Sequence, residues 1–218
     1  MYGASKRIAL GCEVCVGHSM ETIKVTIEGT TPLLMNRFTD EAAVKMAGGT
    51  SAVMVGSKGT PREQAAKKAY VDERGVLHIP GTNIFRAIID AGTFHKAGKS
   101  KITTQKSSLV PAAMALIELT CPILLPKSGV PDWEVDSRSV VIPSTGGRIM
   151  CHRPRVDVWR LAFTLEVDTG MFTLPLVRQL LDDAGKRIGL GDFRPARKGP
   201  FGRFVVVSWD VEKETKTA

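Results

Sequence analysis

The sequence predicts an α+β fold in which two helices cover one face of an antiparallel sheet. Apolar residues recur at three- and four-residue steps in two segments, 82–92 and 173–185, as on one side of a helix. Other segments have the alternating or continuous apolar pattern of strands. With the intervening segments set aside, the order is strand, helix, strand, strand, helix, strand. This order favours a sheet with both helices on the same face.

Length and composition indicate one globular domain with large insertions. The chain has 218 residues, of which 43% are hydrophobic, and no run approaches the roughly 20 apolar residues of a membrane span. Residues 1–18 lack the apolar core and the cleavage site of a secretory signal. We therefore expect a cytoplasmic protein with no membrane partner.

The first strand is expected at 23–28, where apolar and polar residues alternate up to Gly29. Residues 1–19 come before this regular pattern and are interpreted as an N-terminal extension, with a tag remnant or an upstream start as the alternatives. After the strand, an apolar stretch at 30–38 leads into an excursion rich in Ala and Gly at 39–59, which is typical of a surface loop.

A short helix and two short strands complete this first insertion, which spans about residues 39–79. The sequence Thr-Pro-Arg-Glu at 60–63 supplies an N-cap, a proline at the first helical position and a capping-box acid. A helix through Ala69 is therefore expected. Residues 70–80 have the pattern of two short strands around a turn that contains glycine.

The first main helix is expected from Thr82, which can cap it, to Gly92, which ends it. Its apolar stripe includes Ile84 and Ile88, one helical turn apart. The second main strand is expected at 114–119.

The remaining core elements follow a second insertion, at about 121–155. Residues 121–144 contain four prolines, with one short strand expected at 139–142. The core then continues with a long third strand at 156–167, a second helix at 173–185 and a fourth strand at 204–209.

This order predicts a ferredoxin-like, RRM-like core over residues 20–211, followed by a tail at 212–218. RNA-recognition modules on such a sheet stack bases on aromatic side chains of the middle strands. Aromatic residues make up only 6% of this chain. We therefore expect the loops, more than the sheet face, to hold a ligand.

The charge of the chain favours an anionic partner. The formal net charge is +8 and the pI is about 9.5. Basic residues gather in three segments, 94–108, 148–160 and 187–204, which we interpret as connections. Charge on connections, not paired along helix faces, indicates a nucleic-acid footprint. The alternative is that these loops are basic for solubility.

The segment 187–204 is the strongest candidate for nucleic-acid binding among the three. It has four glycines, five basic residues and a single acid. Glycine lets another backbone come close, and Arg and Lys supply charge for a polyanion, so we interpret it as a loop that binds the nucleic-acid backbone. An ordinary turn rich in Gly and Pro is the alternative.

A helix N-terminus attracts phosphates, so the start of the first helix is expected to bind the same nucleic-acid strand as this loop, from the opposite side. The alternative is a well-capped helix start with no ligand. The candidate nucleic-acid-binding residues are Asn36, Arg37, Gly81, Thr82, Asn83, Arg86, Lys96, Lys99, Lys101, Arg153, Arg155, Arg187, Gly191, Arg194, Arg197, Lys198 and Arg203.

Two segments resemble a known superfamily. Residues 78–88, His-Ile-Pro-Gly-Thr-Asn-Ile-Phe-Arg-Ala-Ile, resemble the Ile-Pro-Gly-Ser-Ser-Leu-Lys-Gly-x-x-Arg motif of repeat-associated (RAMP) proteins, in particular the backbone subunits of CRISPR effector complexes. Asn83, Phe85 and Ala87 depart from that motif. The helix, glycine-rich loop and strand at 176–207 are similar to the C-terminal signature of the superfamily.

The resemblance implies a subunit that assembles head to tail along a guide RNA. Its partners would be the guide, a complementary single-stranded nucleic acid, further copies of the chain and other effector subunits. The insertion at 121–155 would form a thumb hairpin that kinks the RNA at regular intervals.

The resemblance also raises the question of catalysis. Some relatives cut target RNA with an Asp in the loop between the first strand and the first helix, where Asp40, the candidate catalytic residue, and Asp72 lie here. Such an Asp needs a metal and a held target. Guide-processing relatives use His, and His78, His95 and His152 have no evident partner in the sequence. We expect a binding subunit without a cofactor.

The cysteines show a weak pattern of zinc ligands. Cys12 and Cys15 with His18 have the spacing of half a zinc site, which Cys151 and His152 could complete. Reduced structural thiols suit a cytoplasmic protein better, so no metal is expected.

Two other functions fit the same residues. A single-stranded DNA-binding or annealing protein would have the same charge and the same glycine loop, and RNA binding that survives 2′-deoxy substitution would favour it. A guide-processing endoribonuclease would cut RNA without divalent metal and lose activity on a His→Ala change.

Overall fold

The computed structural model describes residues 20–39, 59–124, 133–141 and 146–212. The expectations for Asp40, Cys12, Cys15 and His18 lie outside these ranges.

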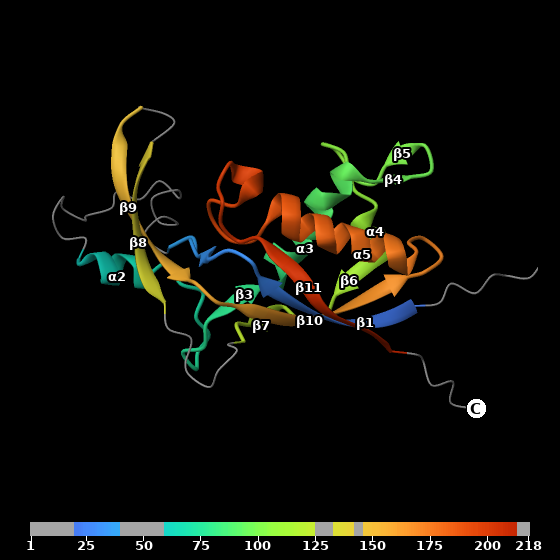
Figure 1. Cartoon of the computed structure of the whole chain (residues 1–218), viewed down its shortest axis with the longest axis horizontal. Coiled ribbons are helices and arrows are strands. Elements are labelled where there is room, and N and C mark those ends of the chain that lie inside the picture. The colour runs from blue at the N-terminus through green and yellow to red at the C-terminus, as the bar shows by residue number, and fades with distance from the viewer. Residues whose placement is uncertain (1–19, 40–58, 125–132, 142–145, 213–218) are drawn as a thin grey trace, which may run out of the picture.

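The main sheet is antiparallel and has two helices on one face (Figure 1). Its strand order is β11-β1-β10-β6. The elements are β1 (Met20–Gly29), α3 (Gly81–Ala91), β6 (Met114–Leu116), β10 (Arg160–Asp168), α5 (Leu174–Asp183) and β11 (Phe204–Glu212). The prediction of an α+β fold with antiparallel strands is confirmed.

The alternation in β1 sets which face of the sheet is buried. Ile23, Val25 and Ile27 have at most 1% exposure, whereas Lys24 between them is exposed. β1 pairs with β10 from Met20 opposite Asp168 to Glu28 opposite Arg160, so the apolar side chains of both strands point to the same side.

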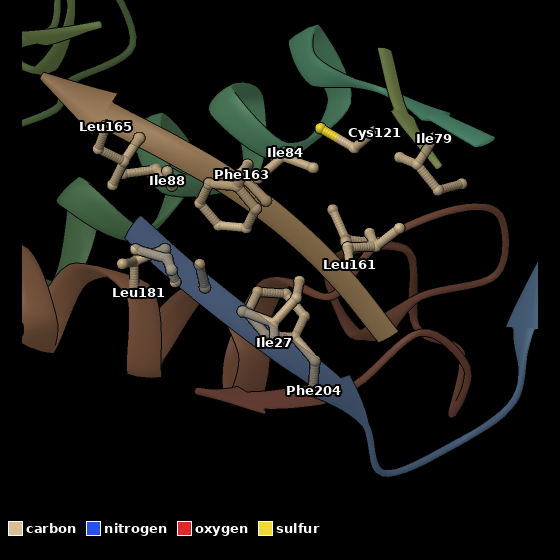
Figure 2. Close-up of a cluster of buried hydrophobic side chains, with 14 of the residues drawn as sticks. Ile27, Ile79, Ile84, Ile88, Cys121, Leu161, Phe163, Leu165, Leu181 and Phe204 are labelled. Carbon is tan, nitrogen blue, oxygen red and sulfur yellow. The ribbon is translucent and has the colours of Figure 1, made fainter. Parts of the chain in front are cut away.

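The core lies between this face and the two helices (Figure 2). Phe163 and Leu165 of β10 lie near Ile84 and Ile88 of α3, with Leu181 of α5 on the other side of the cluster. All five are at most 2% exposed. The one-turn spacing of Ile84 and Ile88 is what places both in the core.

Cys121 belongs to this core and lies beside Ile79 in Figure 2. Burial, and to a smaller extent the nearby Glu118 carboxylate, raises the pKa of its thiol to about 11. Cys121 is therefore an inert structural thiol, as expected for a reduced protein.

The start of α3 differs from the prediction, because Thr82 does not cap it. The strand β3 (His78–Pro80) pairs with β7 (Thr120–Pro122) and runs directly into the helix. Pro80 occupies the N-cap position without a side-chain hydrogen bond. The Gly81 N–H donates to the Leu119 carbonyl at 2.9 Å, so the cross-strand backbone takes the place of a capping side chain.

The predicted capping box is confirmed in α2 (Pro61–Ala66), which ends three residues earlier than expected. The Glu63 N–H donates to the Thr60 hydroxyl at 3.3 Å. In return, the Glu63 carboxylate accepts from the Thr60 N–H at 2.7 Å.

A second sheet projects away from the first (Figure 1). It has the order β2-β9-β8. Its strands are β2 (Leu33–Leu34), β8 (Glu134–Val141) and β9 (Arg148–Val156). The short strand expected at 139–142 is thus the end of a longer one, and the sequence did not indicate β2 or β9.

The third core strand begins later than predicted, at Arg160 and not at 156. β9 ends at Val156, and the chain turns before β10 because Trp159 enters the core. The Trp159 indole N–H donates to the Thr31 carbonyl at 2.9 Å, which holds the turn against the segment after β1.

Smaller elements complete the chain. The Lys-rich segment forms a short hairpin, and the paired strands expected at 70–80 reduce to one bridge between Val71 and Leu77. These elements are β4 (Lys96–Ala97), β5 (Ser100–Lys101), α4 (Val110–Ala113) and the helical turns η1 (Gly92–Phe94), η2 (Ala184–Ile188) and η3 (Pro195–Arg197). Within the described ranges, none of the helices has the length and apolar content to span a membrane.

Candidate nucleic-acid interface

A cavity of about 200 Å³ lies where four segments meet. These are the segment after β2, the segment before β3 with Tyr70, the first turns of α3 and the loop after η2. Five of the predicted binding residues line it, namely Asn36, Asn83, Arg86, Gly191 and Arg194. The structure therefore brings together residues that the sequence separates by more than a hundred positions.

The loop after η2 reaches the cavity because it packs closely on β2. Gly191 has φ +72°, and a Cβ there would lie 2.3 Å from the Leu34 carbonyl oxygen. The next residue, Asp192, donates its N–H to that same carbonyl at 2.8 Å. Only glycine allows this approach, so the loop is held at a fixed place beside the cavity.

Two arginines bring positive charge to the cavity. Arg86 extends from α3 with a side chain that is 69% exposed, and its Nε donates to Asp90 at 2.9 Å. Arg194 donates from Nη1 to the Gly191 carbonyl at 2.9 Å, which fixes its direction. Guanidinium groups suit phosphate oxygens because they present several donors in one plane.

Asp192 is the acid of the cavity, and the sequence did not single it out. Its Oδ2 accepts from Arg153 Nη1 at 2.7 Å and from Asn36 Nδ2 at 3.1 Å. Its Oδ1 accepts from the N–H of Phe193 at 2.9 Å. The only early signal was that Asp192 is the single acid in a basic loop.

Arg153 does not fit its predicted role as a nucleic-acid contact. Its side chain is 5% exposed and pairs with Asp192 and, at 3.7 Å, with Asp136. It fastens β9 to the loop after η2, and a buried guanidinium between two carboxylates cannot meet a phosphate in solvent.

Other predicted basic residues lie away from the cavity lining. Arg155 on β9 pairs with Asp157 at 2.7 Å and Glu134 at 2.5 Å, and the hydrogen bond to Asp157 is the main cause of its raised pKa. Arg187 pairs with Asp183 at 2.9 Å and lies over the ring of Phe94. These two are committed to contacts within the protein.

The remaining predicted residues, apart from Gly81, are exposed around the cavity or further away. Arg37, Arg197, Lys198 and Arg203 are exposed on the segments that border it, and Lys96, Lys99 and Lys101 are exposed on the β4–β5 hairpin. Gly81 is buried, and its N–H is bonded to Leu119. Thr82 lines a separate apolar hollow beside β6.

The histidines have partners that the sequence did not reveal. His95 Nε2 lies 2.9 Å from an Asp183 carboxylate oxygen, and His152 Nδ1 lies 2.7 Å from the Ser137 hydroxyl. His78 is different, since its buried Nδ1 has no hydrogen-bond partner within the described part of the chain. These three are not among the described residues that line the cavity.

Asp72 and Cys151, which the sequence offered for catalysis and for metal binding, contact other groups of the protein. Asp72 accepts from the N–H groups of Arg74 and Val76, so it stabilises a turn. Cys151 accepts from Lys68 Nζ at 3.1 Å. Among the described residues there is no group of three or more side chains arranged to hold a metal ion.

Comparison with known proteins gives a likeness in fold. No protein-family model matches the chain, and no curated protein matches it. The chain is similar to one in the cryo-EM structure of the type III-B Cmr-beta bound to cognate target RNA, with a TM-score of 0.52 and 10% identity. The match covers 89% of this chain and 61% of that one. This chain therefore spans about three fifths of that neighbour, and the likeness concerns the fold.

A second, weaker likeness is to the crystal structure of Cmr6 from Pyrococcus furiosus. It has a TM-score of 0.41 and 12% identity, and it covers 86% of this chain and 98% of that one.

Proposed function

We propose that this chain is an RNA-binding subunit of a CRISPR-type ribonucleoprotein effector, and that it binds the backbone of single-stranded RNA at the cavity. One observation supports this function most. Asn36, Asn83, Arg86, Gly191 and Arg194, which the sequence singled out from three separate segments, line the same cavity. The neighbour of similar fold, from type III-B Cmr-beta, was solved with target RNA.

The core is proposed to be ferredoxin-like. The main sheet has the order β11-β1-β10-β6, and these are the fourth, first, third and second of its strands along the chain. A helix follows the first strand and another follows the third. This connectivity supports assignment of residues 20–211 to one such domain, with insertions at about 39–79 and 121–155.

Binding at this site is independent of base sequence. Arg86 and Arg194 supply charge to phosphates, and the N-terminal turn of α3 adds the positive end of a helix dipole. Contacts of this kind position a nucleic acid without reading its bases. Each copy of the protein along a guide RNA would meet a different base sequence, so contacts to the phosphates suit this role.

The resemblance of residues 78–88 and 176–207 to RAMP backbone subunits further implies assembly along the guide. Copies of the chain would lie head to tail, together with other effector subunits, in the cytoplasm. The hairpin of β8 and β9 projects from the core and is the element that would act as a thumb (Figure 1). No cofactor and no cutting activity are part of this function.

Nucleic acid that co-purifies with the protein tests the function. The protein is isolated without a high-salt wash, and the extracted material is digested with RNase and with DNase. We expect RNA of discrete length, protected in regular steps, because each copy would cover the same number of nucleotides. DNA or random fragments would favour the annealing protein. Protein free of nucleic acid that also fails to bind added RNA would reject both.

A further inference from the structure

The carboxylate of Asp192 is not explained by phosphate binding. It lies in the same cavity lining as Arg86 and Arg194, and its side chain is 31% exposed. A carboxylate beside a phosphate site repels the phosphate, which lowers affinity. Neutralising Arg153 does not by itself explain Asp192, because that guanidinium also lies near a second buried carboxylate, Asp136.

Asp192 is held in one orientation by three donors. Arg153 and Asn36 donate to Oδ2 at 2.7 Å and 3.1 Å, and the Phe193 N–H donates to Oδ1 at 2.9 Å. A carboxylate accepts about four hydrogen bonds, so one acceptor position remains after these three. One acceptor position of the carboxylate is therefore left for a hydrogen-bond donor that enters the cavity.

The RNA backbone offers one such donor in every nucleotide, the ribose 2′-hydroxyl. Donors on bases differ in position from one base to another, which does not suit a site that ignores sequence. The cavity, at about 200 Å³, is smaller than the roughly 300–1,000 Å³ of pockets for whole small molecules, so it suits one part of a nucleotide chain. A phosphate held by Arg86 and Arg194 would place its attached sugar in the cavity that Asp192 also lines.

We propose that Asp192 accepts a hydrogen bond from one ribose 2′-hydroxyl per copy of the chain, and that this contact makes the protein select RNA over single-stranded DNA. This selectivity rests on the proposed function, since it needs a backbone bound at the cavity. Arg153 and Asn36 act as positioning residues, because they hold the carboxylate and do not themselves receive the hydroxyl.

The first test uses the wild-type protein and three oligonucleotides of one sequence, all-ribo, all-deoxy and 2′-fluoro, in a fluorescence anisotropy titration. We expect the ribo form to bind at least about tenfold more tightly than the other two, as for one hydrogen bond to a charged group. The 2′-fluoro form keeps the sugar shape of RNA but cannot donate. Equal binding of ribo and 2′-fluoro forms, or of ribo and deoxy forms, would overturn the assignment.

The second test compares two variants. Asp192→Asn should bring the ribo-to-deoxy ratio of affinities close to one, mainly through weaker binding of RNA. Asp136→Asn removes the other carboxylate beside Arg153 without changing a residue that lines the cavity, so its ratio should stay that of the wild type. A ratio that stays high in a folded Asp192→Asn protein, or falls equally in both variants, would contradict the role of Asp192.

The two proposals fail in different ways. A folded wild-type protein that binds neither polymer rejects the proposed function and this inference together. A protein that binds both polymers equally rejects the 2′-hydroxyl contact alone. If Asp192→Asn does not fold, the wild-type series with the 2′-fluoro oligonucleotide can still overturn the 2′-hydroxyl contact.

Discussion

Replacing Gly202 with Ala should lower the free energy of unfolding by about 2–6 kcal/mol, the sum of backbone strain and overpacking. Gly202 has φ +70°, and a Cβ there would lie 1.8 Å from the carbonyl oxygen of Leu190. The Gly202 N–H donates to the Pro32 carbonyl at 2.8 Å, and the Gly202 carbonyl accepts from the Leu190 N–H at 2.8 Å. The glycine thus joins the loop after η2 to the segment between β1 and β2. Urea denaturation followed by circular dichroism measures the change.

Gly98→Ala is the matched control for this result. Gly98 also has a positive φ, +61°, but nothing lies within 4 Å of the position of its Cβ. We expect it to cost only the strain of a left-handed residue, about 1–2 kcal/mol. Equal losses in the two variants would mean that the contact between Gly202 and Leu190 does not hold the loop.

Removing both arginines of the cavity should weaken RNA binding by about 100-fold at low salt, because two charge-assisted hydrogen bonds are lost. In the Arg86→Ala, Arg194→Ala double variant, the slope of log affinity against log salt should also fall, by about 1.4 for two phosphate contacts on a single strand. The loss should be the same for shuffled sequences, since phosphates carry no sequence information. Anisotropy titrations at several salt concentrations measure both quantities.

A control with the same loss of charge uses Lys24→Ala and Arg178→Ala. Lys24 pairs with Glu212 at 2.5 Å, and Arg178 pairs with Asp182 at 3.2 Å. Neither is among the described residues that line the cavity. This variant should keep nearly all of its affinity. If both double variants lose affinity equally, the binding reflects net charge and not the cavity.

Elements with local signals could be predicted from the sequence. The alternation of Ile23, Val25 and Ile27 and the stripe of Ile84 and Ile88 each follow from neighbours in the chain, and both are confirmed. The break before β10 could not be found in this way. The apolar pattern continues through it, and the turn depends on a contact between Trp159 and Thr31, 128 residues apart.

In the candidate site, too, residues with a local signal could be predicted, whereas residues defined by contacts between distant segments could not. Arg86 and Arg194 stood out because they lie beside a helix N-terminus and in a glycine-rich loop. Asp192 and its contact with Asn36 did not, because 156 residues separate the two partners and only folding brings them together. Arg153 stood out by charge alone, and charge does not reveal that a side chain is 5% exposed.

The most direct test of the central claim is where RNA touches the protein. Single-stranded RNA that carries 4-thiouridine is bound to the wild-type protein, irradiated, and the crosslinked peptides are identified by mass spectrometry. RNA bound at the cavity predicts crosslinks to peptides that contain Asn36, Tyr70, Asn83 and residues 189–194. Crosslinks confined to the β4–β5 hairpin, or to β1 and β10 of the main sheet, would contradict it.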